Sequence, residues 1–286
     1  MVKIGAQTYS LRQECSTDLI GTLDALRDIG FQTVEPPMQH FVALPGIPQE
    51  NPNPLWSQET LATAVKHLRE IGMACTSVHI GVSLGPYALP MEVIRDHILS
   101  LHDTFGITDF VSSGVFKTTE MVRHWAELAQ KISDVIRPWG CRMLYHNHNE
   151  EFQPLDGREG DEDAMELFLK ETSDDVLLQV DIGWAGMETD VPAFLRKHPD
   201  RVGSIHLKDF YPGFRQYSRE EMPTEMFAPI GEGVIPTREV LSMLDSFPHF
   251  GGTVIIDQDK SGNNLRDLEI GYRNILRMLS GQEGKA

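Results

Sequence analysis

Three short apolar segments each end at, or just after, a side chain that commonly binds metal ions. The segment VLLQVD ends at Asp181, the segment VGSIHLK carries His206 near its end, and the segment GTVIID ends at Asp257. Buried parallel strands read as near-continuous Val, Ile and Leu, so polar residues where such runs end need a reason. In barrels of alternating strands and helices, active sites are built at that end of the strands.

Side-chain alternation along a strand predicts which of these groups share a face. If Asp181, His206 and Asp257 all point into a barrel mouth, three strands deliver an oxygen, a nitrogen and an oxygen ligand to one place. This set suits a divalent metal ion such as Mn²⁺, Co²⁺ or Mg²⁺, with Zn²⁺ less favoured. Lys208 lies on the same face as His206, where its ammonium could contact a substrate oxyanion or remain a plain surface charge.

The segment YHNHNEEF offers a fourth metal ligand. Alternation places His146 and His148 on one face, whereas Glu151 lies past the strand, where alternation no longer decides. We choose Glu151 as the ligand because two carboxylates that flank a substrate can exchange its protons, which gives Glu151 and Asp257 the catalytic roles. His146 and His148 are then expected to contact the substrate or the metal ligands.

Further polar or aromatic residues at predicted strand ends are candidates for substrate binding. Gln7, Glu35 and His79 are placed to bind substrate hydroxyls, and Trp184 to form an apolar wall for one face of a sugar ring. Structural hydrogen bonding is the alternative for the three polar residues, and core packing is the alternative for Trp184.

Helical and strand-like segments alternate along the chain. Strands are predicted at 2–9, 31–35, 73–79, 109–112, 141–146, 176–181, 202–208 and 252–257, and helices at 19–29, 57–71, 90–105, 118–137, 164–170, 191–197, 237–246 and 264–279. Proline-rich residues 39–56 are expected to form a loop over one face, and residues 210–234 a second long loop. Eight strand–helix units of roughly 35 residues each predict a single (β/α)8 TIM barrel that occupies residues 1–286 as one domain.

The hydrophobic content, the net charge and the cysteines of the chain indicate which kinds of partner it can have. With 286 residues, 41% of them hydrophobic, the chain has the composition of a folded domain, and we see no apolar run near the roughly 18 residues that span a bilayer. The net charge of −17 argues against nucleic-acid binding, which depends on clustered Lys and Arg. The three widely spaced cysteines favour neither a disulfide framework nor structural zinc. We expect a cytoplasmic protein with no membrane partner. Whether it forms homo-oligomers through loops at the barrel faces stays open.

Several motifs together resemble those of the xylose isomerase-like barrel superfamily. This superfamily contains sugar and sugar-phosphate isomerases and epimerases, inosose dehydratases, and the endonuclease IV type of DNA-repair enzyme. The matching pieces, spread over nearly the whole chain, are GAQTYSLR (5–12), YHNH (145–148) with Glu151-Phe152, DIGW (181–184), HLKD (206–209), GEG (231–233) and DQD (257–259). The resemblance is specific for the superfamily and weakly specific for the substrate.

The resemblance implies a metal site and a reaction. Family members hold their metal through a Glu, an Asp, a His and a final Glu, which correspond by position to Glu151, Asp181, His206 and Asp257. The implied activity is isomerisation or epimerisation of a sugar or keto-sugar, by carboxylate proton transfer through a metal-stabilised enediolate. Two departures matter: Asp257 has a shorter reach than the usual Glu, and Trp184 stands where related ketose 3-epimerases carry a His.

Other functions stay open beside the isomerase or epimerase. A metal-dependent lyase or dehydratase acting on a keto-sugar or inosose would use the same metal and base but expel a β-substituent. A non-catalytic sugar-binding barrel would keep the fold and some of the ligands. A DNA-repair activity is disfavoured, because that relative needs a basic face and this chain is acidic.

Overall fold

The computed structural model describes residues 2–38, 55–81, 89–114, 116, 118–155 and 163–281. The expected loop at 39–56 falls almost entirely outside these ranges. Among the described residues, no helix combines the length and the apolarity that crossing a bilayer requires.

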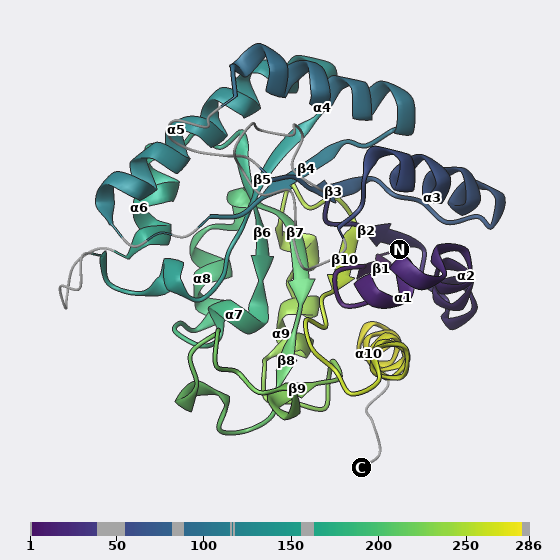
Figure 1. Cartoon of the computed structure of the whole chain (residues 1–286). Coiled ribbons are helices and arrows are strands. Elements are labelled where there is room, and N and C mark those ends of the chain that lie inside the picture. The colour runs from purple at the N-terminus through teal and green to yellow at the C-terminus, as the bar shows by residue number, and fades with distance from the viewer. Residues whose placement is uncertain are drawn as a thin grey trace.

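Eight parallel strands form the centre of the described molecule (Figure 1). They are β1 (Lys3–Gln7), β2 (Thr33–Glu35), β3 (Ser77–His79), β4 (Asp109–Ser112), β5 (Arg142–His146), β6 (Val176–Asp181), β7 (Val202–Leu207) and β10 (Thr253–Ile256). Their order in the sheet is β2-β1-β10-β7-β6-β5-β4-β3. Parallel bridges from Thr33 to Ala74 and from Pro37 to His79 join the two ends of this order. The sheet is therefore a nearly closed ring, and the predicted single (β/α)8 barrel is confirmed.

Helices surround the strands (Figure 1). They are α1 (Arg12–Thr17), α2 (Leu19–Ile29), α3 (Gln58–Glu70), α4 (Met91–Phe105), α5 (Thr119–Ile136), α6 (Ala164–Glu171), α7 (Ile182–Ala185), α8 (Val191–Lys197), α9 (Thr237–Ser242) and α10 (Asn264–Leu279). Side-chain caps fix several first turns, as where Asp18 accepts from the Gly21 amide and Ser57 from the Thr60 amide. These caps, with apolar faces at helical spacing, explain why the helix positions could be predicted.

The strands place their polar residues at one end of the barrel. Every residue of β6 and of β7 is buried, as expected for strands that carry helices outside and a packed core inside. The inward-facing positions near their carboxyl ends are nevertheless polar, namely Gln179, Asp181 and His206. The parallel register places Asp181 opposite His206 and His146 opposite Gln179. The fold thus gathers polar side chains where the strands end.

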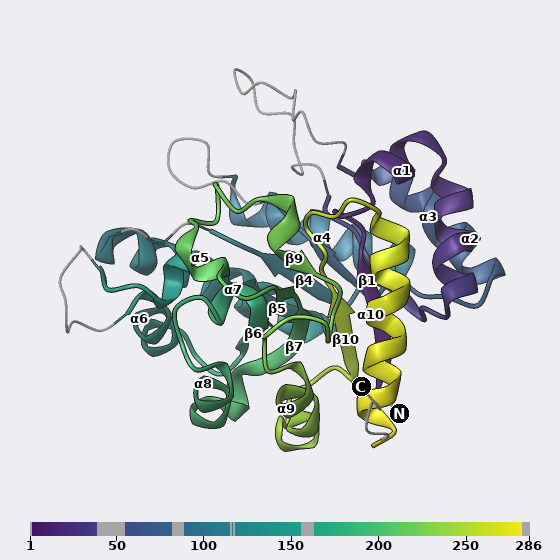
Figure 2. The ribbon, with the colours of Figure 1, turned by 90° about the horizontal axis from the view of Figure 1, so that it is seen from below.

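The loop expected at 210–234 contains structure that the sequence pattern did not predict. Strands β8 (Asp209–Phe210) and β9 (Phe227–Ala228) pair antiparallel. Figure 2 shows β9 at the end of the barrel away from the N-terminus. The carboxylate of Asp209 accepts hydrogen bonds from the backbone amides of Gly231, Gly233 and Ile235. One buried side chain therefore ties the far end of this loop to the end of β7.

Candidate active site

Four buried residues bring their ligand atoms together at the carboxyl end of the barrel. These are His146 of β5, Asp181 of β6, His206 of β7, and Asp257, which directly follows β10; their ligand atoms all lie within 4.8 Å of one another. Three of the four predicted metal ligands are in this group, which we call the His/Asp group. The fourth member is His146, which we expected to contact the substrate.

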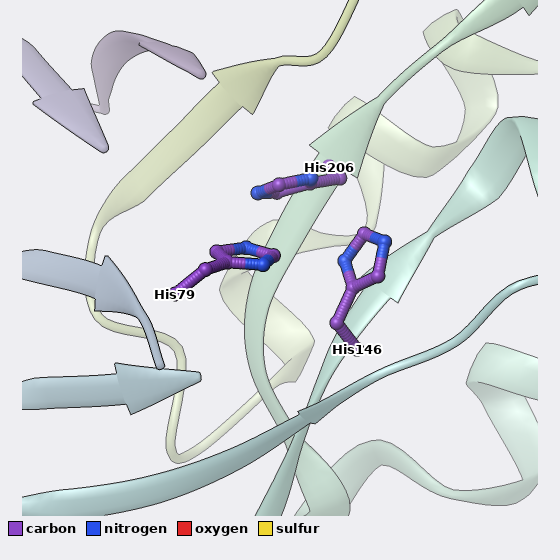
Figure 3. Close-up of side chains that lie close together, drawn as sticks. All are labelled: His79, His146 and His206. Atoms are coloured by element: carbon purple, nitrogen blue, oxygen red, sulfur yellow. The ribbon is translucent and has the colours of Figure 1, made fainter. Parts of the chain in front are cut away.

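A third imidazole adjoins the His/Asp group. Figure 3 shows the rings of His79, His146 and His206 gathered in one place. The ring centroid of His146 lies 4.8 Å from that of His206 and 5.1 Å from that of His79. The alternate strands β3, β5 and β7 deliver these rings because each residue stands at, or one position before, the end of its strand.

Glu151 does not join the His/Asp group. After β5 the chain enters a short 3-10 turn, Glu150–Phe152, which folds the buried Glu151 side chain back toward β5. The Tyr145 hydroxyl donates to Glu151 Oε1 at 2.7 Å, and the His148 amide donates to Oε2 at 2.9 Å. The structure instead groups Glu151 with His148 and Glu150, so its predicted meeting with the other three ligands does not occur.

The fully buried carboxylate of Glu35 organises the floor of the site. Its Oε1 accepts from His206 Nε2 at 2.8 Å and from Gln7 Nε2 at 3.1 Å. It also lies 2.8 Å from His79 Nε2, a nitrogen that is hydrogen-bonded to Gln179 Oε1 at 2.8 Å. Burial alone would raise the pKa of Glu35, but the charges of His206 and His79 and their hydrogen bonds hold that pKa below its ordinary value. Glu35 thus positions two imidazoles, and Gln7 contacts Glu35 rather than an imidazole.

Hydrogen bonding fixes the direction in which His146 presents a lone pair. Gln179 Nε2 donates to Glu35, which leaves Gln179 Oε1 to accept from His146 Nδ1 at 3.0 Å. His146 Nε2 is then the nitrogen without a proton, and it lies 4.0 Å from Asp181 Oδ2. Burial, together with the charges of His206 and His79, lowers the pKa of His146 well below its ordinary value. A neutral imidazole with an inward lone pair is what metal binding requires.

His206 lies between two carboxylates. Its Nε2 is 2.8 Å from Glu35 Oε1, and its Nδ1 is 3.3 Å from Asp257 Oδ2. Burial lowers the pKa of His206, but the negative charges of Glu35 and Asp257 outweigh burial and raise it to about 10. Without a bound cation, both ring nitrogens therefore carry protons and donate to these carboxylates.

The ammonium of Lys208 is enclosed by three carboxylates. Its Nζ lies 2.7 Å from Asp181 Oδ2, 2.9 Å from Asp257 Oδ2 and 2.8 Å from Asp259 Oδ2. The Trp184 ring centroid is 4.9 Å away. Burial disfavours the charged form, but the three carboxylates raise the pKa of Lys208 above its ordinary value. Because an ammonium has three donors and each has a carboxylate partner, Lys208 has no donor left for the expected substrate oxyanion.

Above this floor is a cavity of about 370 Å³. The predicted site residues that line it are Gln7, His79, His146, His148, Trp184 and Asp257. Sequence reasoning did not assign the basic residues Arg12 and Lys260 to the site, and Arg219 falls in the long loop expected at 210–234. All three line the cavity, and no periodic pattern marks them because they lie outside the strands.

The residues present fit a divalent metal ion. Two imidazoles and two carboxylates form a buried set of the kind that binds Mn²⁺, Co²⁺ or Zn²⁺. Asp257 Oδ1 is buried and has no hydrogen-bond partner among the described residues, which is a cost unless a cation or a ligand contacts it. The chemistry of the set and the orphaned oxygen both favour a cation at this place.

A family model described as Xylose isomerase-like TIM barrel matches residues 23–273. The chain belongs to the xylose isomerase-like TIM barrel family. A search of the curated proteins found no match.

Solved structures similar to this xylose isomerase-like barrel include different kinds of enzyme. A sugar phosphate isomerase/epimerase from Parabacteroides distasonis is 20% identical, with a TM-score of 0.76 over 98% of this chain and 95% of that one. A probable 3-DHS dehydratase from Bacillus anthracis is 13% identical, with a TM-score of 0.69 over 96% and 98% of the two chains. An L-ribulose 3-epimerase is 14% identical, with a TM-score of 0.67 over 99% and 96%. Identities this low establish a shared fold and leave the reaction to be argued from the site.

Proposed function

We propose that this protein is a divalent-metal-dependent isomerase or epimerase that acts on a sugar or keto-sugar by proton transfer next to a carbonyl. The observation that carries the proposal is the buried His/Asp group beneath a polar cavity at the carboxyl end of the barrel. Family membership and structural neighbours that include a sugar phosphate isomerase/epimerase and an L-ribulose 3-epimerase support this class of reaction.

The metal would be held by the His/Asp group: His146, Asp181, His206 and Asp257. Mn²⁺ is our first choice, and Co²⁺, Mg²⁺ or Zn²⁺ are the alternatives. When bound, such an ion polarises a substrate carbonyl and its neighbouring hydroxyl. Glu35 and Gln179 would orient His206 and His146 through the hydrogen bonds described above.

Asp257 is the group best placed to take the substrate proton. Its Oδ2 is fixed by Lys208 and His206, while Oδ1 has no hydrogen-bond partner among the described residues and the side chain lines the cavity. A carboxylate with one anchored and one free oxygen can accept a proton without changing its position.

His148 is our candidate for the group that exchanges the second proton. Its side chain lines the cavity, and its Nδ1 lies 3.8 Å from Glu151 Oε1. His148 Nδ1 has no hydrogen-bond partner among the described residues, so in this proposal Glu151 holds the backbone of His148 through its amide, in place of the direct catalytic role expected from the sequence. Trp184 and Phe227, which also line the cavity, would give a sugar ring an apolar surface.

A lyase or dehydratase that acts on a keto-sugar or inosose is the second candidate. Trp184 stands where related ketose epimerases have a His, so the contact expected for ketose epimerisation is missing. A structural neighbour is a probable 3-DHS dehydratase, and loss of a β-substituent would need the same metal and the same base.

Proton exchange in deuterated water tests the proposal. The protein with Mn²⁺ is incubated with a panel of ketoses, keto-sugars and inososes, and each reaction is followed by NMR. We expect deuterium to enter next to the carbonyl of at least one compound and Asp257→Asn to slow this exchange strongly. An unsaturated or deoxy-keto product would favour the lyase. Sugar binding without proton exchange would contradict catalysis and favour a non-catalytic sugar-binding barrel.

The cytoplasm is the compartment we propose for this activity. Cys15, Cys75 and Cys141 are all free and buried. Unpaired thiols of this kind suit a compartment in which cysteines stay reduced.

A further inference from the structure

Lys208 connects two sequence motifs that lie 25 residues apart, DIGW at 181–184 and HLKD at 206–209. Asp181 of the first motif accepts from its ammonium at 2.7 Å, and the ring centroid of Trp184 lies 4.9 Å from the same nitrogen. The Lys208 side chain is 1% exposed. A fully buried lysine is rare, and it requires compensating charges around it.

Gly183 makes room for the stem of Lys208. A Cβ atom added at Gly183 would lie 2.6 Å from Lys208 Cβ and 2.8 Å from its Cγ, which is too close for any larger residue without movement. Three residues of the DIGW motif thus surround the lysine. Asp181 pairs with its ammonium, Gly183 leaves room for its stem, and Trp184 presents an aromatic ring to its ammonium. The close fit indicates that the residues around Lys208 specify its buried position in the site.

The ammonium takes up the oxygens that a metal ion would need. Asp181 Oδ1 already accepts from the amides of Gly183 and Trp184, which leaves Oδ2, and Lys208 contacts that oxygen. Lys208 also contacts Asp257 Oδ2 at 2.9 Å. Both carboxylates belong to the His/Asp group, so an incoming divalent cation meets a positive charge already seated between two of its ligands.

We propose that Lys208 is a built-in cation that holds the carboxylates of Asp181 and Asp257 in place before metal binds and competes with the metal for them. The site is then assembled without metal, and the affinity for metal is lower than the same ligands would give alone. Loss of the ammonium leaves two facing carboxylates that a divalent ion can neutralise. The inference rests on the proposed metal site but does not depend on which reaction that site performs.

The experiment measures Mn²⁺ binding by isothermal titration calorimetry on the purified, metal-stripped chain. Lys208→Met should bind Mn²⁺ roughly tenfold or more tightly than the natural chain, because a unit positive charge within a few ångströms is removed. Mn²⁺ should also raise the melting temperature of Lys208→Met more than that of the natural chain. Lys131→Met is the matched control, since it removes a lysine paired with Glu127 on the exposed surface of α5, and its affinity should be unchanged.

A charge-balanced variant guards against misfolding of the single substitution. Lys208→Gln with Asp259→Asn removes one positive and one negative charge together, and Asp259 is outside the proposed ligand set. This double variant should also bind Mn²⁺ more tightly than the natural chain. If the natural chain binds Mn²⁺ and neither variant binds it more tightly, the proposed role of Lys208 is wrong while the metal site stands. Absence of binding by all of these proteins would overturn the metal site as well.

Discussion

The two ends of the barrel carry cavities of nearly equal size and opposite character. At the amino end, a cavity of about 380 Å³ is lined by Asp109 and Arg142 among others, and these two side chains pair with each other. The remaining Arg142 nitrogen donates to the His249 carbonyl at 2.7 Å. At the carboxyl end, the cavity of about 370 Å³ lies over a floor of buried carboxylates, imidazoles and Lys208, and one Asp257 oxygen there has no hydrogen-bond partner among the described residues. Clustered buried charge with an orphaned oxygen, and not cavity size, distinguishes the candidate active site.

Asp257→Asn should give the largest difference in proton-exchange rate between a change at the carboxyl end and a change at the amino end of the barrel. The change keeps the shape of the side chain but removes the carboxylate that we assign both to metal binding and to proton transfer. We expect the exchange of substrate protons to slow by about 10²–10⁴-fold, measured by NMR in deuterated water. Asp109→Asn, the amino-end counterpart, should leave the rate unchanged. Equal losses in the two variants would remove the distinction between the ends.

Glu35→Gln should have an intermediate effect. Glu35 touches His206 and His79 but does not belong to the His/Asp group, so the change removes a charge that orients ligands and leaves the ligands themselves. We expect the affinity for Mn²⁺, measured by calorimetry, to fall about 10–100-fold, as is typical for such outer partners. An unchanged affinity would show that the buried network around Glu35 is only structural.

Arg142→Met should have the smallest effect, and only on stability. The Arg142 and Asp109 side chains are 28% and 15% exposed, so solvent weakens their interaction. We expect the free energy of unfolding, measured by chemical denaturation, to fall by about 1 kcal/mol or less. Proton exchange at the opposite end should not change. A marked loss of exchange in a folded variant would mean that the amino end takes part in the reaction.

Local sequence patterns were sufficient to predict the barrel. Apolar runs of strand length, capped helices and glycine stops recur along the chain, and each follows from short-range chemistry. Strand ends were less predictable: the run expected at 73–79 is a strand only at Ser77–His79, with Ala74 in a single bridge to Thr33. The β8–β9 pair could not be predicted because each strand is two residues long and the two come from distant parts of the loop.

The candidate site was predictable where a residue sits on a strand or directly follows it. Alternation and strand ends led to Asp181, His206 and Asp257, which the structure brings together. Glu151 lies past the end of β5, and its direction is set by the Tyr145 hydroxyl, a contact that no spacing rule describes. The surroundings of Lys208 were equally hidden, because its carboxylate partners come from the ends of two different strands and meet only once the barrel closes.

The central claim is that His146, and not Glu151, completes a divalent metal site with Asp181, His206 and Asp257. Calorimetric titration of the metal-stripped protein with Mn²⁺ tests it most directly when the natural chain is compared with His146→Gln and Glu151→Gln. We predict that the natural chain binds Mn²⁺, that His146→Gln loses most of this binding, and that Glu151→Gln retains it. No binding by the natural chain, or loss with Glu151→Gln but not with His146→Gln, would contradict the claim.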